Sequence, residues 1–259
     1  MGVAARHQGM ALVRFYAELN DFLPPALQQR RFEYRFDVAP PIKDVIESLG
    51  IPHTEVDLVL ANGESVDLTY RVRDSDTVSV YPVFESLDIS PIVRIRATPL
   101  RVMRFVLDVH LGRLARYLRM LGFDTLYRNK YDDPELARIS CEEGRILLTR
   151  DRGLLMRNMV AHGYWVRSTH PAEQAGEVLR RFDLYRAARP FTRCICCNGL
   201  LETVEKASIL HRLQPQTAHY YDEFSICPEC KRVFWKGSHY QRMLRLIAHL
   251  LGQETSETT

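Results

Sequence analysis

The chain has 259 residues, of which 46% are hydrophobic and 26% are charged, as in a soluble globular protein with one large domain or two to three small ones. This composition excludes a collagen, a disordered tail protein and a small disulfide-rich protein. Charged residues interrupt every apolar run before the ~18 residues that a membrane span requires, and the amino terminus lacks the ordered regions of a signal sequence. We therefore expect a cytoplasmic protein that does not enter a membrane.

The formal net charge of +3 is unevenly distributed along the chain. Residues 1–90 contain 8 Lys and Arg against 14 Asp and Glu, a net charge of −6, whereas residues 91–259 contain 27 against 18, a net charge of +9. Most basic residues of the second part are arginines, whose planar guanidinium group suits phosphate. The charge pattern therefore predicts that a polyanion such as RNA binds to the second part of the chain.

A ubiquitin-like β-grasp domain is predicted at residues 1–90, because strands, a helix and further strands follow one another in that order. Asn62-Gly63 between two alternating apolar runs is typical of a tight hairpin turn, and Pro41 suits the first position of a short helix. The predicted elements are strands at residues 10–17 and 32–38, a helix at 41–50, a hairpin at 56–72 and a strand at 77–84.

The end of this domain is similar to the end of the ubiquitin-like sulfur-carrier proteins. Those carriers finish in a free Gly-Gly, whereas this chain continues through Ser90 and Pro91. The sequence therefore disfavours a sulfur-carrier role and favours a folded appendage or a docking module for a protein partner.

An α/β domain is predicted at residues 104–189, after a linker at residues 91–103 that Pro91 and Pro99 keep out of helix. Alternating strands and helices indicate a parallel sheet with crossover helices. Residues 190–259 form a third region, with two cysteine clusters and an amphipathic helix at residues 238–251. The predicted elements of the α/β domain are strands at 105–108, 124–128, 145–151 and 163–168, and helices at 110–122, 131–144 and 175–184.

Aspartates follow two strands of this predicted parallel sheet. Asp108 and Asp151 each end a strand, so we expect both carboxylates at the crevice where the carboxyl ends of parallel strands meet. Carboxylates that lie close together repel one another unless a cation neutralises them, and hard oxygen ligands suit Mg²⁺ or Mn²⁺. Asp132 and Asp133 begin the intervening helix and can complete the cluster. The alternative for each aspartate is a helix cap or loop residue, and Asp133, next to Pro134, is especially open to it.

The two cysteine clusters predict a structural zinc site in the third region, since six cysteines are too few for a disulfide scaffold. Cys194 and Cys197 form one C-x-x-C pair and Cys227 and Cys230 form the other, the spacing of a tetrahedral zinc ribbon. The alternatives are a redox dithiol and a disulfide. The 29 residues between the pairs can hold an inserted hairpin or helix, and Cys196 falls outside the C-x-x-C spacing. Cys141, alone on a helix, is expected to be a buried small residue.

Basic residues in two places are candidates for RNA binding. One set lies on the predicted helix at 110–122, opposite its leucine stripe, and the other lies beside or on the final helix, where cations can hold phosphates. Trp235 is expected to pack the zinc ribbon against the α/β domain. The candidates are Arg113, Arg116 and Arg119 in the first set, and Lys236, His239, Arg242 and Arg245 in the second.

Two continuous segments and the two cysteine clusters form a long and ordered set of motifs. They are LDVHLGRLARYLRMLGFDTLY, DDPELARISCEEGRILLTRDRGLL, and the clusters C-x-x-C-N-G-L-L and C-x-x-C-x-x-V-F-W-x-G-S-H. Over about residues 104–246 these motifs resemble the Mut-seven C-terminal RNase family of PIN-like, metal-dependent nucleases. Residues 10–90 resemble the ubiquitin-like domain that bacterial members often carry.

The resemblance implies that Asp108, Asp133 and Asp151 are the acidic metal-binding residues, with Asp132 and Thr149 in support. One departure follows Asp108, where the family commonly has a small residue and then methionine or leucine and this chain has Val109-His110. PIN-like folds also include members that bind RNA without cutting it.

Together these features predict a metal-dependent ribonuclease that hydrolyses RNA phosphodiesters with Asp-bound Mg²⁺ or Mn²⁺ and is stabilised by Zn²⁺. The alternative is a non-catalytic RNA-binding or adaptor protein that uses the same basic surface while the β-grasp domain binds a protein partner. A sulfur-carrier-related accessory protein is a third, disfavoured class.

Overall fold

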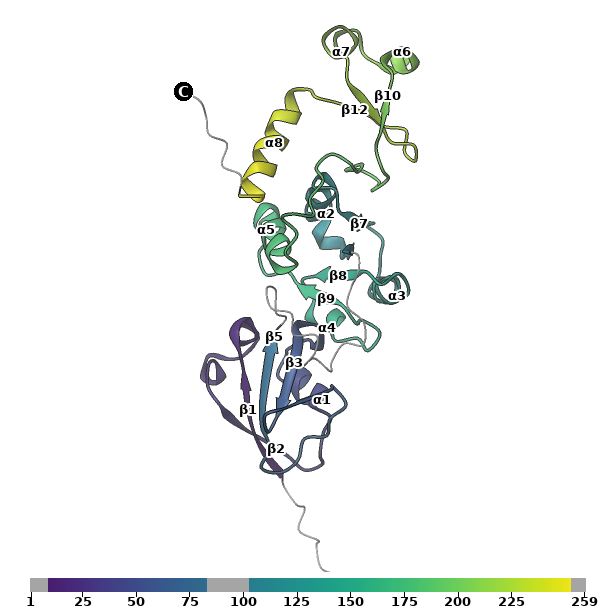
Figure 1. Cartoon of the computed structure of the whole chain (residues 1–259). Helices are drawn as coiled ribbons and strands as arrows, with labels where there is room; N and C mark the ends of the chain where they lie inside the picture. Colours follow the sequence, from purple (N-terminus) through teal and green to yellow (C-terminus); the bar gives the residue numbers. More distant parts are fainter. Residues whose placement is uncertain (1–8, 83–102, 253–259) are drawn as a thin grey trace, which may run out of the picture. The chain divides into compact units, whose positions relative to one another are not determined.

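The computed structural model describes residues 9–82 and 103–252 of the chain (Figure 1). These residues form two compact units, each of which is described by itself. In the described ranges, the first unit combines residues 9–82 with residues 132–165, and the second combines residues 103–131 with residues 166–252. Apart from Met103, the predicted linker lies outside the described residues.

The start of the first unit is a ubiquitin-like β-grasp fold, as predicted. Its five strands are ordered β2-β1-β5-β3-β4; β1 and β5 are parallel, and the other neighbours are antiparallel. The β3–β4 hairpin turns at Asn62 and Gly63, whose φ angles of 52° and 88° suit this residue pair. The elements are β1 (Gly9–Phe15), the 3₁₀ helices η1 (Ala17–Phe22), η2 (Pro25–Leu27) and η3 (His53–Glu55), β2 (Phe32–Phe36), α1 (Ile42–Ser48), β3 (Val56–Ala61), β4 (Glu64–Val66) and β5 (Thr77–Pro82).

The core of this fold follows from the alternation of its strands. Ala11, Val13 and Phe15 are fully or almost fully buried on one face of β1, as period-two alternation requires. They belong to the same apolar cluster as Val45 and Ile46 of α1, which are fully buried. Burial of this shared apolar area is the main stabilising contribution to the domain.

The remainder of the first unit comes from the middle of the chain. β8 and β9 pair in parallel, from Leu147 opposite Gly163 to Thr149 opposite Trp165. Trp165 packs against the apolar core of the β-grasp fold, which groups these residues with the amino-terminal domain. The elements are α3 (Asp133–Glu143), β8 (Ile146–Thr149), α4 (Arg152–Leu155) and β9 (Gly163–Trp165).

The second unit contains a parallel strand pair, two helices that pack against each other, and a three-stranded ribbon. β6 and β7 are parallel, α2 contacts α5, and the antiparallel ribbon has the order β10-β11-β12. The stretch between β10 and β11 holds three short helices, consistent with the predicted insertion. The elements are β6 (Arg104–Leu107), η4 (Val109–Leu111), α2 (Gly112–Met120), β7 (Asp124–Leu126), α5 (Pro171–Arg181), β10 (Glu202–Val204), α6 (Lys206–Ile209), η5 (Leu210–Arg212), α7 (Pro215–Tyr220), β11 (Phe224–Ile226), β12 (Val233–Trp235) and α8 (Ser238–Leu250).

The end of α2 fixes where the chain enters the ribbon. The main-chain N–H groups of Arg189 and Phe191 donate to the carbonyls of Leu121 and Met120 at 2.8 and 2.9 Å. Gly122 allows this approach, because its φ is +95° and a Cβ there would lie 2.2 Å from the carbonyl oxygen of Arg189. The ribbon is therefore attached to α2 through main-chain hydrogen bonds.

No helix in the described parts of the chain is long and apolar enough to cross a membrane. The helix α8 has 13 residues, whereas a spanning helix needs about 20 apolar ones.

Candidate functional site

Asp108 lies directly after β6, at the point where η4 begins. Phe105, Val106 and Leu107 are fully buried in this strand, and Asp108 itself is only 6% exposed. Its carbonyl oxygen accepts a 2.9 Å hydrogen bond from the N–H of Leu111, which closes the first turn of η4. A carboxylate is therefore held in a largely desolvated position at a strand end, where it is costly unless it is paired or binds a cation.

Asp151 is the N-cap residue of α4, and Thr149 helps to fix its position. Oδ1 of Asp151 accepts a 2.7 Å hydrogen bond from the N–H of Gly153, as an N-cap requires. The N–H of Asp151 donates to Oγ1 of Thr149 at 2.9 Å, and Thr149 is fully buried at the end of β8. Thr149 thus orients the turn that carries Asp151.

Asp132 and Asp133 have different local roles. Asp132 is the N-cap of α3 and accepts a 2.8 Å hydrogen bond from the N–H of Glu135. Asp133 is the first helical residue, and its Oδ2 lies 3.7 Å from Nη2 of Arg157. The expectation that Asp133 is the one most open to capping is wrong, because Pro134 occupies the second helical position and Asp132 makes the cap. The Asp133 side chain is half exposed and forms no cap bond.

The second unit contains a polar pocket of about 590 Å³. One of the residues that line it is His110, which follows Asp108 by two residues in the chain. Arg113 and Arg116 are exposed on the first turns of α2 and line the pocket together with His110. Tyr127 is held in its wall by a 2.9 Å hydrogen bond from its hydroxyl to the carbonyl of Val109. Two guanidinium groups and a histidine in one hollow are suited to an anion such as phosphate.

Arg119 does not share this surface, which corrects the sequence-based prediction. Its side chain is 4% exposed, and Nη1 donates to the carbonyl of Cys196 at 2.9 Å while Nε donates to that of Thr125 at 2.9 Å. Burial lowers the pKa of Arg119, whereas the nearby cysteines favour its charged form. Arg119 therefore connects α2 to the ribbon and is not available to RNA.

Four cysteine sulfurs form a compact cluster in the ribbon. Cys194 and Cys230 lie 3.6 Å apart, Cys197 and Cys227 lie 3.3 Å apart, and the four sulfurs all lie within 4.8 Å of one another. A tetrahedral zinc with Zn–S bonds of about 2.3 Å requires sulfurs about 3.8 Å apart, so the four residues fit this ion. Burial raises the pKa of Cys194, while hydrogen bonds with the Arg232 backbone and the other cysteines outweigh burial at Cys230 and lower its pKa to about 7.

The other two cysteines lie outside this cluster. The Cys196 sulfur accepts a 2.6 Å hydrogen bond from Nη1 of Arg232, which places it next to a guanidinium group and outside the four-sulfur cluster. Cys141 is exposed on α3, so the expectation of a buried small residue is wrong. Its place on the helix lies far around the axis from the buried Leu136 and Ile139.

The residues beside the final helix have mixed surroundings. Lys236 forms a 2.5 Å ion pair with Glu223, whereas His239 and Arg242 are exposed on α8, as is Arg245. Trp235 is 40% exposed and lines an apolar pocket of about 380 Å³ between the ribbon and α8. The expectation that Trp235 packs the ribbon against the α/β domain is therefore wrong, and the hydrogen bonds of Arg119 to Thr125 and Cys196 make that connection.

Comparison with known proteins places these features in a family. Residues 103–247 match the family model described as the Mut7-C RNAse domain. The chain belongs to this Mut7-C RNase family. Residues 9–88 match the model of the Mut7-C ubiquitin domain. A human relative described as "Exonuclease mut-7 homolog" is 36% identical over 106 residues, which is 39% of this chain and 12% of that protein, so the chain spans about an eighth of the relative's length. No solved structure matches the chain.

The predicted acidic residues of this Mut7-C chain fall in both units. Asp133 and Asp151 belong to the first unit and Asp108 to the second. The structure brings the four predicted cysteines together and places Arg113 and Arg116 in one pocket. Sequence reasoning did not find the other residues of that pocket, among them Tyr127 and Gln174, because they come from two later segments with no shared motif.

Proposed function

We propose that this Mut7-C protein is a metal-dependent ribonuclease in which Asp108, Asp133 and Asp151 together bind Mg²⁺ or Mn²⁺. The observation that carries the proposal is the placement of Asp108, a 6% exposed carboxylate directly after a buried strand in the RNase-family region. Carboxylate oxygens are the hard ligands that Mg²⁺ and Mn²⁺ prefer, and the end of a strand in this region is where the family resemblance places the first of them. When bound, the cation supplies an activated water and stabilises charge on the phosphodiester.

The supporting residues act on this centre through position and charge. Thr149 and the Gly153 N–H orient the Asp151 carboxylate, and Asp132 fixes the start of the helix on which Asp133 lies. Arg113 and Arg116 hold RNA phosphates in the pocket that they line together with His110. His239 and Arg242 on α8 extend the RNA surface, while Lys236 contributes less because it pairs with Glu223.

A zinc ion held by Cys194, Cys197, Cys227 and Cys230 has a structural role in this proposal. All four positions are thiolates, so no coordination position is left for a catalytic water. The ubiquitin-like domain is proposed to take part in protein contacts. The proposed location is the cytoplasm, as expected from the sequence.

The test is cleavage of a single-stranded RNA by the full chain with and without Mn²⁺. Asp133→Asn is expected to lower cleavage strongly, because it removes a ligand charge. Asp132→Asn is the matched control, since asparagine is as good an N-cap as aspartate. Equal losses in the two variants would move the third ligand away from Asp133, and RNA that is bound but never cut would favour the non-catalytic alternative.

A further inference from the structure

The ubiquitin-like domain contacts the residues that surround Asp151. The guanidinium carbon of Arg152, the residue after Asp151, lies 4.1 Å from the ring centroid of Trp165 and 4.8 Å from that of Phe22. The two rings are themselves 4.9 Å apart. Phe22 ends η1 of the ubiquitin-like domain, so one cation bridges an aromatic pair formed by that domain and β9.

Trp165 is also bound to the turn on the other side of Asp151. Its indole Nε1 donates a 3.2 Å hydrogen bond to the carbonyl of Arg150. Arg150 and Arg152, the two chain neighbours of Asp151, therefore both contact Trp165. The position of Trp165 consequently determines where the Asp151 turn lies.

Trp165 in turn is held by the ubiquitin-like domain. Its main-chain N–H donates a 2.7 Å hydrogen bond to Oε1 of Glu55, a fully buried carboxylate in η3. Nearby, Nε2 of His53 lies 3.0 Å from the carbonyl of Val160. A hydrogen bond in a buried position is electrostatically stronger than one at the surface, so this attachment is firm.

We infer that the ubiquitin-like domain positions the Asp151 turn through Phe22, Trp165 and Arg152. This inference rests on the proposed function, because it concerns the same acidic residues. Asp151 lies between two arginines that are attached to Trp165, and Trp165 is attached to Glu55 and packs against Phe22. The domain thus acts on catalysis from within the chain, whereas a docking appendage for other proteins would leave the turn unaffected.

The inference is tested in the full chain with paired variants. Phe22→Leu keeps an apolar side chain but removes the ring that faces Arg152, and Phe32→Leu is its control because Phe32 stacks on Phe15 within the same domain. Arg152→Ala removes the bridging cation, and Arg152→Lys keeps a cation over the rings. The measurements are hydrogen exchange at the Gly153 N–H and the kcat and KM of RNA cleavage.

We expect Phe22→Leu and Arg152→Ala to speed exchange at Gly153 and to lower kcat about tenfold with little change in KM, as expected for a misplaced catalytic group. Phe32→Leu is expected to leave both measurements unchanged, and Arg152→Lys to restore most of the loss.

Three results would overturn the inference. One is unchanged exchange at Gly153 in Phe22→Leu and Arg152→Ala. Another is a rise in KM with unchanged kcat in Arg152→Ala, which would mean that Arg152 contacts RNA directly. The third is an equal loss in Phe32→Leu. If the wild-type chain cuts no RNA, the proposed function fails, while the exchange measurement still decides whether the domain fixes the turn.

Discussion

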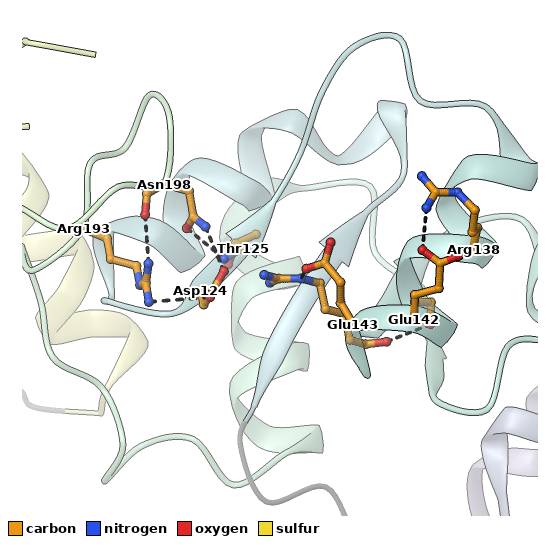
Figure 2. A network of polar contacts seen from close by, with 9 residues as sticks. Asp124, Thr125, Arg138, Glu142, Glu143, Arg193 and Asn198 are labelled. Atoms are coloured by element: carbon orange, nitrogen blue, oxygen red, sulfur yellow. Dashed lines mark hydrogen bonds and ion pairs between the residues drawn. The ribbon is translucent and has the colours of Figure 1, made fainter. Parts of the chain in front are cut away.

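Asn198, the residue after Cys197, donates a 2.8 Å hydrogen bond through Nδ2 to Oδ1 of Asp124 at the start of β7 (Figure 2). Its Oδ1 accepts a 2.9 Å bond from the buried N–H of Thr125, and Arg193 lies 3.7 Å from Asp124. The Asn198 side chain thus pairs two groups of β7, and Asn198 directly follows one of the four clustered cysteines. Folding of the ribbon and its attachment to the parallel strands are therefore coupled.

Removal of this side chain is expected to destabilise the second unit. Asn198 has a φ of +79°, which glycine also adopts without strain, so Asn198→Gly removes the hydrogen bonds and keeps the backbone. The Thr125 N–H then loses its partner while fully buried, which costs about 1–3 kcal/mol. Chemical unfolding measures the loss, with the exposed Asn129→Ala as control. Equal stability of the two variants would show that this contact contributes nothing.

The four-cysteine cluster leads to a second prediction. Purified protein is expected to contain one zinc per chain, and Cys227→Ser is expected to lose it, because a structural site needs all four ligands. Cys196→Ser is the matched control, since Cys196 lies outside the four-sulfur cluster and bonds Arg232. Elemental analysis measures both. Zinc loss in Cys196→Ser with retention in Cys227→Ser would mean that the ligands are assigned wrongly.

Acid is expected to weaken the attachment of the ubiquitin-like domain. Burial, with a contribution from Lys43, lowers the pKa of His53, although Glu47 and the Val160 carbonyl oppose this shift. The folded state therefore prefers neutral His53, and the unfolded chain takes up the proton first as pH falls below about 6.5. This contribution to stability is present above that pH and is lost below it.

The measurement is the free energy of unfolding between pH 7.5 and pH 5, compared for the wild type and His53→Gln. The variant is expected to show a flatter fall in stability over this range, because it cannot take up the proton. Exposed His170 provides the control His170→Gln, which is expected to keep the wild-type profile. Identical profiles in all three proteins would exclude His53 as the titrating group.

RNA affinity is expected to depend on salt through the pocket at α2. Each phosphate contact to single-stranded RNA contributes about 0.7 to the slope of log affinity against log salt, so neutralisation of Arg113 and Arg116 is expected to reduce the slope by about 1.4. The control is Arg138→Ala, because Arg138 pairs with Glu142 on α3 (Figure 2) and is not among the residues that line the pocket. An unchanged slope in the double variant would place the RNA elsewhere.

The sequence predicted those features that local patterns determine. The Asn62-Gly63 hairpin and the cysteine pairs depend on residues close in the chain, and both are present. The prediction that Arg119 is exposed was wrong. Helical periodicity shows which side of the helix a residue occupies, but it does not show which other segment packs on that side, and here the ribbon packs on Arg119.

The contact of Trp165 with Phe22 was not predicted for a related reason. Two segments more than a hundred residues apart meet there, and neither carries a motif for the other. Because residues 132–165 pack on the ubiquitin-like domain, deletion of that domain would expose Trp165, so point variants are the sounder tests.

The proposed ribonuclease activity depends on a metal ion bound by Asp108 and Asp151. The most direct measurement is the rate of cleavage of single-stranded RNA against Mn²⁺ concentration for the wild type, Asp108→Asn and Asp151→Asn, with folding checked by circular dichroism. Asparagine is as good an N-cap residue as the aspartate that caps α4, so Asp151→Asn removes the charge and leaves the turn intact. Cleavage is expected only with metal, and rates at least about a hundredfold lower in both folded variants. Cleavage at the wild-type rate in both variants, or cleavage that persists with chelator, would contradict the proposed metal-dependent activity.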